Sequence, residues 1–489
     1  MSVRVRKSVL KLADNDATLS WYAKAVAAMR NRPATDSGSW SYQAAMHGFS
    51  AGLPAWQGVG PIPSANERTE YWNQCQHGSW FFLPWHRMYL AYFEQIVART
   101  IVGLGGPADW SLPYWDYSDT TLPNARTLPA AFTIGTPASN PLNVAGRQLG
   151  RPGNTEIPRR DVSLVALSLT DYIADEHGGS PGFGGPRTGF SHGGGQHGGL
   201  EQLPHDMVHV VIGGIMGDPR TAALDPIFWL HHANIDRLWQ VWLNLGGRRN
   251  PVDTPWLNMD FDFHSFDGAP AVLRVQQVLD TRQVLSGYVY EDVPMTGGVQ
   301  QEALEAAAGI TLTAGGSMKS VAPPVMLGMV DKPLALGAAA LTTSLAIHNP
   351  PAPLAAALSA SGVGLESVGP VIDTYLNFEN VKGDGVAPIY DVYLNLPAGA
   401  DPGIHEERCV GSLPMFGVAD ASIASEHQSG SGLHYVLCIT DVLSVLRAQP
   451  GWQDSQLDVT LVPRTAMAAD ATVTVGRISL YAKAGRRER

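Results

Sequence analysis

The sequence is poor in cysteine, in positive charge and in long apolar runs. Three cysteines among 489 residues cannot build a disulfide scaffold. A formal net charge of −11 argues against a nucleic-acid partner. No stretch reaches about 18 clean apolar residues, and the Ala-rich run 337–347 is short and soon followed by prolines. We therefore expect no membrane span.

The first residues, MSVRVRKSVLKL, carry charges without a continuous apolar stretch and make a poor signal peptide. A cytoplasmic protein is the expectation, while export in folded form or with a partner protein stays open. The chain is too long for one ordinary core, so two domains are expected. The oligomeric state, including a homo-oligomer, stays open.

The N-terminal half is expected to be mainly helical. Residues 17–31 and 38–49 predict amphipathic helices, and a third should run from Pro84 to about Ile101. Residues 178–199 are dominated by glycine and predict a long loop at the rim of a site. A short helix is expected over 204–211, and a longer one that Asp225 caps and Pro226 begins, ending near Leu245.

The C-terminal part has a different pattern. Residues 296–365 are rich in Ala, Gly and Pro and predict a connector. From about Val371 the sequence predicts strands, at 390–396, 434–439, 457–461, 471–475 and 478–481, which favours an all-β sandwich. The predicted domains are therefore 1–295, 296–365 and 366–489.

Six histidines form two clusters with few carboxylates among them. The first contains His47, His77 in Cys75-Gln-His77, and His86 in Phe-Leu-Pro-Trp-His-Arg. The second contains His205 and His209, at i and i+4 of the predicted short helix, and His232. Three imidazoles per cluster suit copper, but zinc also accepts three histidines, so ligand type alone leaves both metals open. Most other dinuclear sites need bridging carboxylates, and neither motif clearly supplies one.

Two long motifs carry a family resemblance. H77-x4-F-L-P-W-H86-R-x2-L-x3-E94 and D225-P-x-F-W-x2-H232-x3-D236 resemble the two signatures of type-3 copper proteins, which are tyrosinases, catechol oxidases and molluscan hemocyanins. The resemblance covers about residues 20–292. It implies a four-helix core that holds two copper ions, with His47, His77 and His86 on one and His205, His209 and His232 on the other.

The resemblance extends beyond the histidines. Tyr288-Val-Tyr290 resembles the motif that closes the catalytic domain of plant polyphenol oxidases, where it pairs with an N-terminal arginine; Arg4 and Arg6 are the candidates. Residues 389–395 resemble, more loosely, a motif of those enzymes' C-terminal domain, which can cover the active site. Met415-Phe416 is a candidate plug, and simple packing is the alternative. The fold class expected is thus α+β multidomain: a mainly α-helical di-copper domain followed by a jelly-roll-like β-sandwich.

The resemblance also implies roles around the metals. Glu201, four residues before His205, and Asp206, directly after it, are expected to orient a water that takes the phenol proton, since a phenol has a pKa of about 10. The alternatives are a solvated loop charge for Glu201 and a first-turn helix residue for Asp206. Cys75 is expected to form a thioether with His77.

Substrate access is expected to depend on Pro219, at a gate position, and on Met216 and Phe228. Phe228 lies one turn before His232 and could stack on ligand rings or only fill the core. His231 could hydrogen-bond behind the ligands.

The leading hypothesis is a tyrosinase that hydroxylates small monophenols and oxidises o-diphenols to o-quinones with O2. A catechol oxidase without the first step, a hemocyanin-like O2 carrier and a zinc hydrolase are the alternatives.

Overall fold

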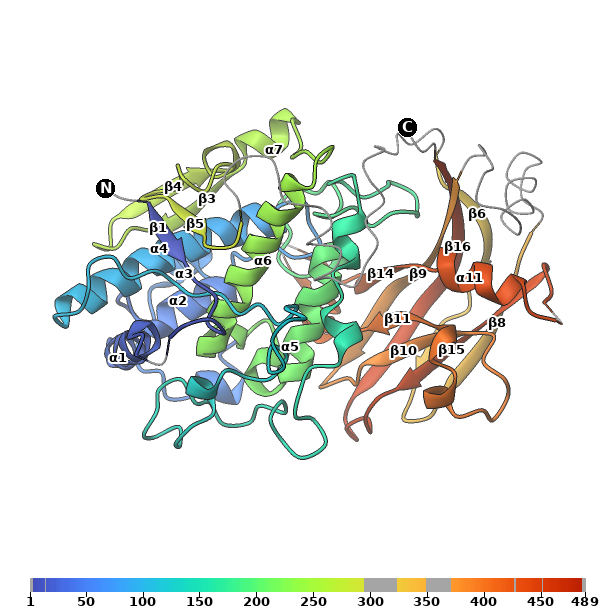
Figure 1. Ribbon diagram of the computed structural model, residues 1–489, viewed down its shortest axis with the longest axis horizontal. Helices are drawn as coiled ribbons and strands as arrows, with labels where there is room; N and C mark the ends of the chain where they lie inside the picture. Colours follow the sequence, from blue (N-terminus) through green and yellow to red (C-terminus); the bar gives the residue numbers. More distant parts are fainter. Residues whose placement is uncertain are drawn as a thin grey trace. The chain divides into compact units, whose positions relative to one another are not determined.

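The computed structural model describes residues 3–13, 15–293, 323–348, 371–425, 428–450 and 452–485. Contacts divide the chain into two compact units. The first unit contains residues 1–76, 81–168 and 203–312, and the second contains 77–80, 169–202 and 313–489. Figure 1 shows the helices and strands of both.

The first unit is mainly helical. Its helices are α1 (Thr18–Arg30), α2 (Trp40–His47), α3 (Ala65–Tyr71), α4 (Phe82–Gly103), α5 (Met207–Ile212), α6 (Pro226–Asn244) and α7 (Thr254–Asn258). The long helix α4 packs against α1 and α6, which makes these three the frame of the unit. All but four residues of α4 are buried, because both its faces meet other elements.

Two small sheets complete this unit. Strand β1 (Arg4–Arg6) pairs in parallel with β5 (Tyr288–Tyr290), which joins the two ends of the unit's sequence. Strands β3 (Asp260–His264) and β4 (Pro270–Arg274) form an antiparallel pair. Short 3-10 helices fill many of the connections: η1 (Pro54–Trp56), η2 (Ala130–Phe132), η3 (Arg159–Val162), η4 (Val165–Ser168), η6 (Gly214–Gly217), η7 (Ala222–Leu224) and η8 (Val275–Gln277).

The second unit is a β-sandwich. One sheet has the order β11-β10-β15-β8 and the other β2-β14-β9-β16-β6, with β7 also on β16. Their bounds are β2 (Gly195–Gln196), β6 (Val325–Val330), β7 (Leu334–Leu336), β8 (Leu341–Ala346), β9 (Val371–Asp384), β10 (Tyr390–Leu394), β11 (Cys409–Leu413), β14 (Leu433–Cys438), β15 (Gln456–Pro463) and β16 (Thr472–Gly485). Inward side chains of both sheets share one apolar core.

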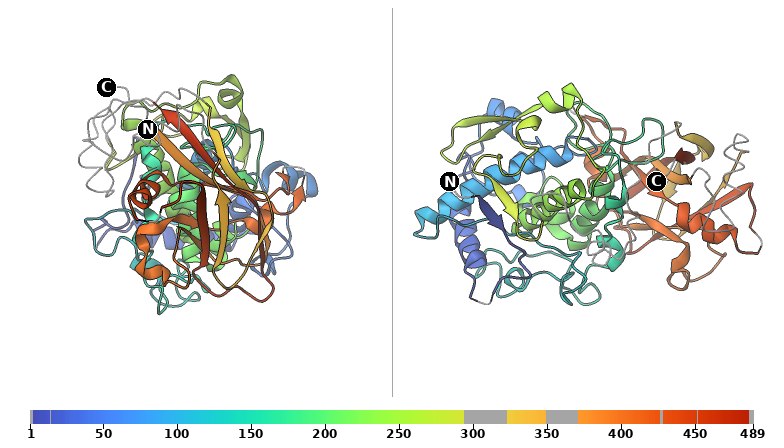
Figure 2. Two further views of the ribbon diagram at one scale, coloured as in Figure 1. Left: turned by 90° about the vertical axis from the view of Figure 1, so that its right-hand side faces the viewer. Right: turned by 45° about the horizontal axis from the view of Figure 1, so that its top comes forward.

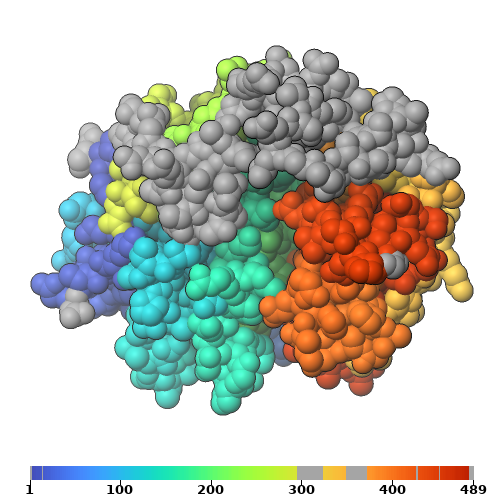
Figure 3. Space-filling model, turned by 45° about the vertical axis from the view of Figure 1, so that its right-hand side comes forward, coloured from blue at the N-terminus to red at the C-terminus, as the bar shows by residue number. Residues whose placement is uncertain are grey.

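Smaller elements surround these sheets. They are the strand pair β12 (Ala424–Ser425) and β13 (Gln428–Ser429), the short helices η9 (Pro402–Ile404), η10 (Glu406–Arg408) and α10 (Val418–Ala421), and helix α11 (Thr440–Arg447). Helix α11 buries Leu443 and Leu446 and belongs to the orange-red surface of Figure 3. The long strands β9 and β16 run side by side, as their orange and dark red ribbons show in Figure 2.

The predicted fold class is confirmed, and so are most predicted elements. Helices α1, α2 and α6 match their predictions, while α4 begins two residues before Pro84, and α5 begins at Met207 rather than Pro204. The predicted strands 471–475 and 478–481 are one continuous strand, β16. Among the described residues, none of the helices is long and apolar enough to cross a membrane.

The predicted connector 296–365 is wrong over its described part, because residues 325–346 form strands β6, β7 and β8. The strand pattern of these residues is weak in the sequence, because Ala and Gly occupy several of their positions. The glycine-rich segment 178–199 is irregular as predicted, except for β2, which pairs in parallel with β14. Residues 169–202 thus belong to the β-rich unit, whereas the predicted domain boundary lies at 295.

Candidate metal centre

Helices α2 and α4 each present one histidine of the first cluster. α2 begins at the cap Ser39, whose hydroxyl accepts a hydrogen bond from the backbone N–H of Tyr42 at 3.0 Å, and ends at His47. α4 carries His86 in its second turn. The rings of His47 and His86 lie 5.6 Å apart between centroids, and both side chains are buried.

Helix α6 presents His232 from a firmly held N-terminus. The carboxylate of Asp225 accepts a hydrogen bond from Ile227 N at 3.1 Å and caps the helix. Arg147 donates to both oxygens of that carboxylate, from Nε at 2.8 Å and from Nη2 at 2.6 Å. Because this ion pair is buried and bidentate, it fixes the start of the helix two turns before His232.

The structure brings five of the six predicted ligands together in the first unit. His232 stacks on His86, with centroids 4.6 Å apart and planes 14° apart. His205 lies 4.6 Å from His209 and 4.9 Å from His232, in edge contacts. The His47 ring is 6.0 Å from that of His232. The two clusters predicted from the sequence therefore meet across α4 and α6.

Four of these imidazoles are held through Nδ1, which leaves the Nε2 lone pair for a metal when Nδ1 carries the proton. The acceptors are the carbonyl of Pro219 for His47 at 2.9 Å, of Phe82 for His86 at 2.8 Å and of Met216 for His209 at 2.9 Å, and Asp206 Oδ1 for His205 at 2.9 Å.

Burial keeps three of the candidate ligands, His86, His209 and His232, neutral. Desolvation lowers the pKa of His86 to about 3, although a hydrogen bond with Phe82 opposes the shift. The pKa values of His209 and His232 lie well below the ordinary value, first because of desolvation and then because of neighbouring imidazoles. A neutral imidazole is the form that binds a metal ion.

The donor set fits copper. Nitrogens of His47, His86 and His232 lie within 4.8 Å of one another, and so do nitrogens of His205, His209, His231 and His232. The Nε2 atoms of His209 and His232 are only 3.2 Å apart. Two nitrogens that face each other so closely suit a shared cation, and imidazole-only donors suit copper or zinc.

His77 belongs to the second unit, and Cys75 to the first. The His77 ring is 6.5 Å from that of His197 and 6.1 Å from that of Phe416, which meets it edge-on. Cys75 is a buried free thiol whose sulfur lies within 4.8 Å of a His47 nitrogen. Because Cys75 and His77 are only two residues apart, their Cα atoms are separated by at most about 7 Å, which is close enough for a thioether. The thioether itself remains a prediction.

Glu201 is buried and accepts backbone hydrogen bonds in the second unit. The N–H of Gly78 donates to its two oxygens at 2.9 and 3.2 Å, and that of Gly198 donates at 3.4 Å. His197 Nε2 is 3.8 Å from Oε1. Glu201 thus fixes the residue that follows His77, which rules out the alternative of a solvated loop charge.

The three residues predicted to control substrate access, Met216, Pro219 and Phe228, all contact histidines of the candidate metal centre. Met216 and Pro219 act through their carbonyls, which hold the rings of His209 and His47. Phe228 packs against His232 with centroids 4.1 Å and planes 34° apart, and it meets His47 edge-on at 4.9 Å. Phe228 therefore touches both clusters, and the gate role of Pro219 remains a prediction.

The predicted arginine partner of the Tyr-x-Tyr motif is Arg6. Its guanidinium lies 3.6 Å from the Tyr288 ring centre and donates to the Tyr290 hydroxyl at 2.9 Å. It also donates to Glu94 at 2.7 Å, and Asp236 lies 3.3 Å away. Arg4 instead lines a surface pocket.

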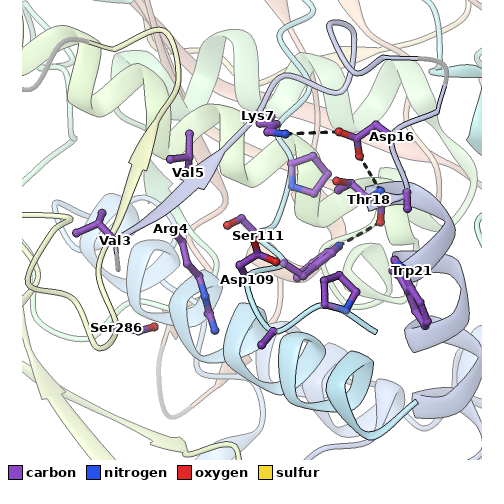
Figure 4. A pocket seen from close by; sticks show the side chains of 15 residues that line it. Val3, Arg4, Val5, Lys7, Asp16, Thr18, Trp21, Asp109, Ser111 and Ser286 are labelled. Atoms are coloured by element: carbon purple, nitrogen blue, oxygen red, sulfur yellow. Dashed lines mark hydrogen bonds and ion pairs between the residues drawn. The ribbon is translucent and has the colours of Figure 1, made fainter. Parts of the chain in front are cut away.

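That pocket, shown in Figure 4, has a volume of about 830 Å³ and contains none of the six histidines. It lies between β1 and residues 107–113, with Trp21 and the Lys7–Asp16 ion pair on its wall. It is therefore separate from the candidate metal centre.

Sequence reasoning missed Tyr117, whose hydroxyl lies 3.1 Å from Nδ1 of His231. It also missed the roles of the Phe82, Met216 and Pro219 carbonyls as acceptors. The run 114–117 is rich in aromatic residues, but nothing in its spacing points to His231 more than 100 residues later.

Comparisons with known families agree with this site. The model described as "Common central domain of tyrosinase" matches residues 37–152 and 136–245, and the "Polyphenol oxidase middle domain" matches 250–297. Residues 324–483 match a domain of unknown function, DUF7868. The matched ranges include all six predicted ligands.

Individual proteins are similar as well. Tyrosinase HcTyr1 of Hahella sp. (strain CCB-MM4) is 37% identical over 98% of this chain and 100% of its own length. The chloroplastic polyphenol oxidase of Malus domestica is 29% identical over 56% of this chain and 46% of its own length. The solved structure of latent apple tyrosinase has the same fold, with a TM-score of 0.59, 22% identity and coverage of 99% of this chain and 98% of that one.

Proposed function

The chain belongs to the tyrosinase and polyphenol oxidase family, and we propose that it acts on both monophenols and o-diphenols. A pair of copper ions is its cofactor, and phenols and O2 are its substrates. In the proposed reactions, a monophenol and O2 give an o-quinone and water, and two o-diphenols and O2 give two o-quinones and two waters. Both equations balance without a further reductant.

The assignment of ligands is part of the proposal. His47, His77 and His86 would hold one copper, and His205, His209 and His232 the other. The observation that supports it most directly is the set of Nδ1 hydrogen bonds, which would leave Nε2 of four buried imidazoles to bind the metals. When bound, the copper pair supplies the activation of O2.

The residues of this chain would prepare the phenol and the ligands. Phe228 touches His47 and His232 and would exclude water from the space beside them. Glu201 would hold a water that takes the phenol proton, since a phenol binds a metal as phenolate. Asp206 would help to orient that water, and its Oδ1, 2.9 Å from Nδ1 of His205, would also hold that ring.

Cys75 would form a thioether with a ring carbon of His77. The thiol S–H and the ring C–H are lost, and the two protons and two electrons pass to O2, which becomes H2O2. Such a bond would fix the His77 ring. Intact mass after copper loading would then fall by the mass of two hydrogens relative to the apo protein, and the Cys75→Ser variant would show no such change.

Metal analysis with steady-state oxygen uptake tests the proposal. Two coppers per chain and O2 uptake with tyrosine, after a lag, and with its o-diphenol without a lag would support it. Uptake with the o-diphenol alone would indicate a catechol oxidase. Zinc in place of copper, or reversible O2 binding without turnover, would exclude both enzymes and indicate a hydrolase or an O2 carrier.

A further inference from the structure

His231 is a fourth imidazole beside the second histidine cluster. Its side chain is fully buried, and its ring stacks on His205 at 5.3 Å and 22°. It meets His209 edge-on at 4.8 Å and His232 at 5.1 Å. A nitrogen of His231 lies within 4.8 Å of the nitrogens of these three residues. Four imidazoles thus lie within reach of a site that needs three.

Tyr117 restrains this fourth ring. Its hydroxyl lies 3.1 Å from Nδ1 of His231, and the two rings are 5.6 Å apart. Both side chains are buried, so this hydrogen bond has no bulk water to compete with it. If Nδ1 accepts the hydroxyl proton, its lone pair is engaged and Nε2 of the neutral ring carries the ring proton, so neither nitrogen can bind a metal.

The backbone that carries Tyr117 is fixed to the same helix as His231. The N–H of Trp115 donates to the carbonyl of Leu230 at 3.1 Å, one residue before His231 in α6. The indole N–H of Trp115 donates to the carbonyl of Ala125 at 2.8 Å. The backbone before Tyr117 is therefore fixed to α6, and the Tyr117 hydroxyl keeps its position relative to the His231 ring (α6 is the green helix of Figure 1).

We propose that Tyr117 is a positioning residue that keeps His231 out of metal coordination, so that His232 supplies the third nitrogen. The inference rests on the proposed ligand assignment. Without the hydroxyl, Nδ1 loses that hydrogen bond and the ring proton can move between the two nitrogens, while the ring stays among the three ligands. A hydrogen bond of this kind favours one arrangement by roughly tenfold, so its loss should let His231 compete with His232 for copper.

The test compares four proteins after copper loading: the parent, Tyr117→Phe, the double variant Tyr117→Phe/His231→Asn, and Tyr22→Phe. The last is a matched control, because Tyr22 is also fully buried and its hydroxyl donates to α6, at the Pro226 carbonyl, at 2.9 Å. The readout is EPR spin count per copper, since two coupled Cu(II) ions are EPR-silent and a misligated ion is visible.

We expect Tyr117→Phe to raise the EPR-visible share of copper roughly tenfold, the double variant to return it to the parent value, and Tyr22→Phe to leave it unchanged. A visible share in Tyr117→Phe no larger than in Tyr22→Phe overturns the inference. So does a double variant that stays as high as Tyr117→Phe, because the cause would then be lost packing.

If Tyr117→Phe does not fold, the single variant His231→Asn decides. It should bind two EPR-silent coppers, and a loss of one copper would show that His231 is itself a ligand and overturn the inference. A parent protein that binds no coupled copper pair would overturn the proposed function instead, so the two failures are distinct.

Discussion

Replacing Asp236 with Asn should destabilise the helical unit strongly. Asp236 lies one turn after His232 on α6 and is buried. Its Oδ1 accepts from Arg87 Nε at 2.5 Å, and its Oδ2 accepts from the hydroxyls of Tyr288 at 2.5 Å and Tyr290 at 2.6 Å. Burial opposes ionisation, but Arg87 and Arg6 outweigh it and hold the pKa of Asp236 below its usual value.

The size of the effect follows from these donors. Asn keeps one acceptor oxygen, so its NH2 group must face at least one of the four donors, which include Arg6, and the charge that balances Arg87 and Arg6 is lost. Breaking one side of a buried ion pair costs about 3–5 kcal/mol. In a unit of this size each kcal/mol lowers the melting temperature by about 2–4 °C, so a decrease of roughly 6–20 °C is expected.

Urea denaturation and thermal melting of the apo protein measure this change, with circular dichroism as the signal. Asp280→Asn is the control, because Asp280 pairs with Arg282 at the surface and its loss should leave both midpoints unchanged. A midpoint for Asp236→Asn within about 2 °C of the parent would refute the reasoning and show that apolar packing, not this cluster, holds β1, β5 and α6 together.

Further predictions concern the site itself. Asp206→Asn should change the ratio of monophenol to diphenol rates, and rates that fall in proportion would contradict a role in monophenol chemistry. Phe228→Ala should cost about 3–5 kcal/mol in urea denaturation and accelerate copper loss to a chelator, since its ring packs on two histidines. Phe416→Ala should raise kcat/KM for a diphenol, because Phe416 covers an edge of His77, and an unchanged value would refute this. The apo protein should be fully stable above about pH 6.5, because burial lowers the pKa values of His86 and His231 to about 3 and protons therefore bind the unfolded chain first. As the pH falls from there toward 3, each of these two histidines should lower the free energy of unfolding by up to about 1.4 kcal/mol per pH unit. Urea midpoints measured across this pH range test the prediction, and midpoints that do not change with pH would contradict it.

Elements whose signals are local could be predicted from the sequence. Asp225 followed by Pro226 marks a helix start through one side-chain hydrogen bond, and the structure has that bond. Residues 390–394 contain the aromatic and β-branched side chains typical of strands, and they form β10. In both cases the information lies within a few residues of the element.

Elements that depend on distant partners could not be predicted from the sequence. Residues 341–346 contain mainly small and polar side chains, and they are a strand because they pair with residues 456–461. The same holds for β2, two residues in a glycine-rich segment that pair with β14. No local pattern distinguishes them from loop, because the partner strand supplies the hydrogen bonds.

The site divides in the same way. The histidines are identifiable because each belongs to a short motif of neighbouring residues, as His205 and His209 do, four positions apart. The groups that orient the histidines cannot be identified from the sequence, because they are distant in it: Pro219 is 172 positions from His47, and Tyr117 is 114 positions from His231. A carbonyl has no residue-type signature at all, so any residue at position 219 could serve His47 if the backbone followed the same path. Ligand identity is thus a property of the sequence, whereas the choice of tautomer is a property of the fold. Substitutions that move the 216–219 backbone should therefore weaken copper binding even where every histidine is retained.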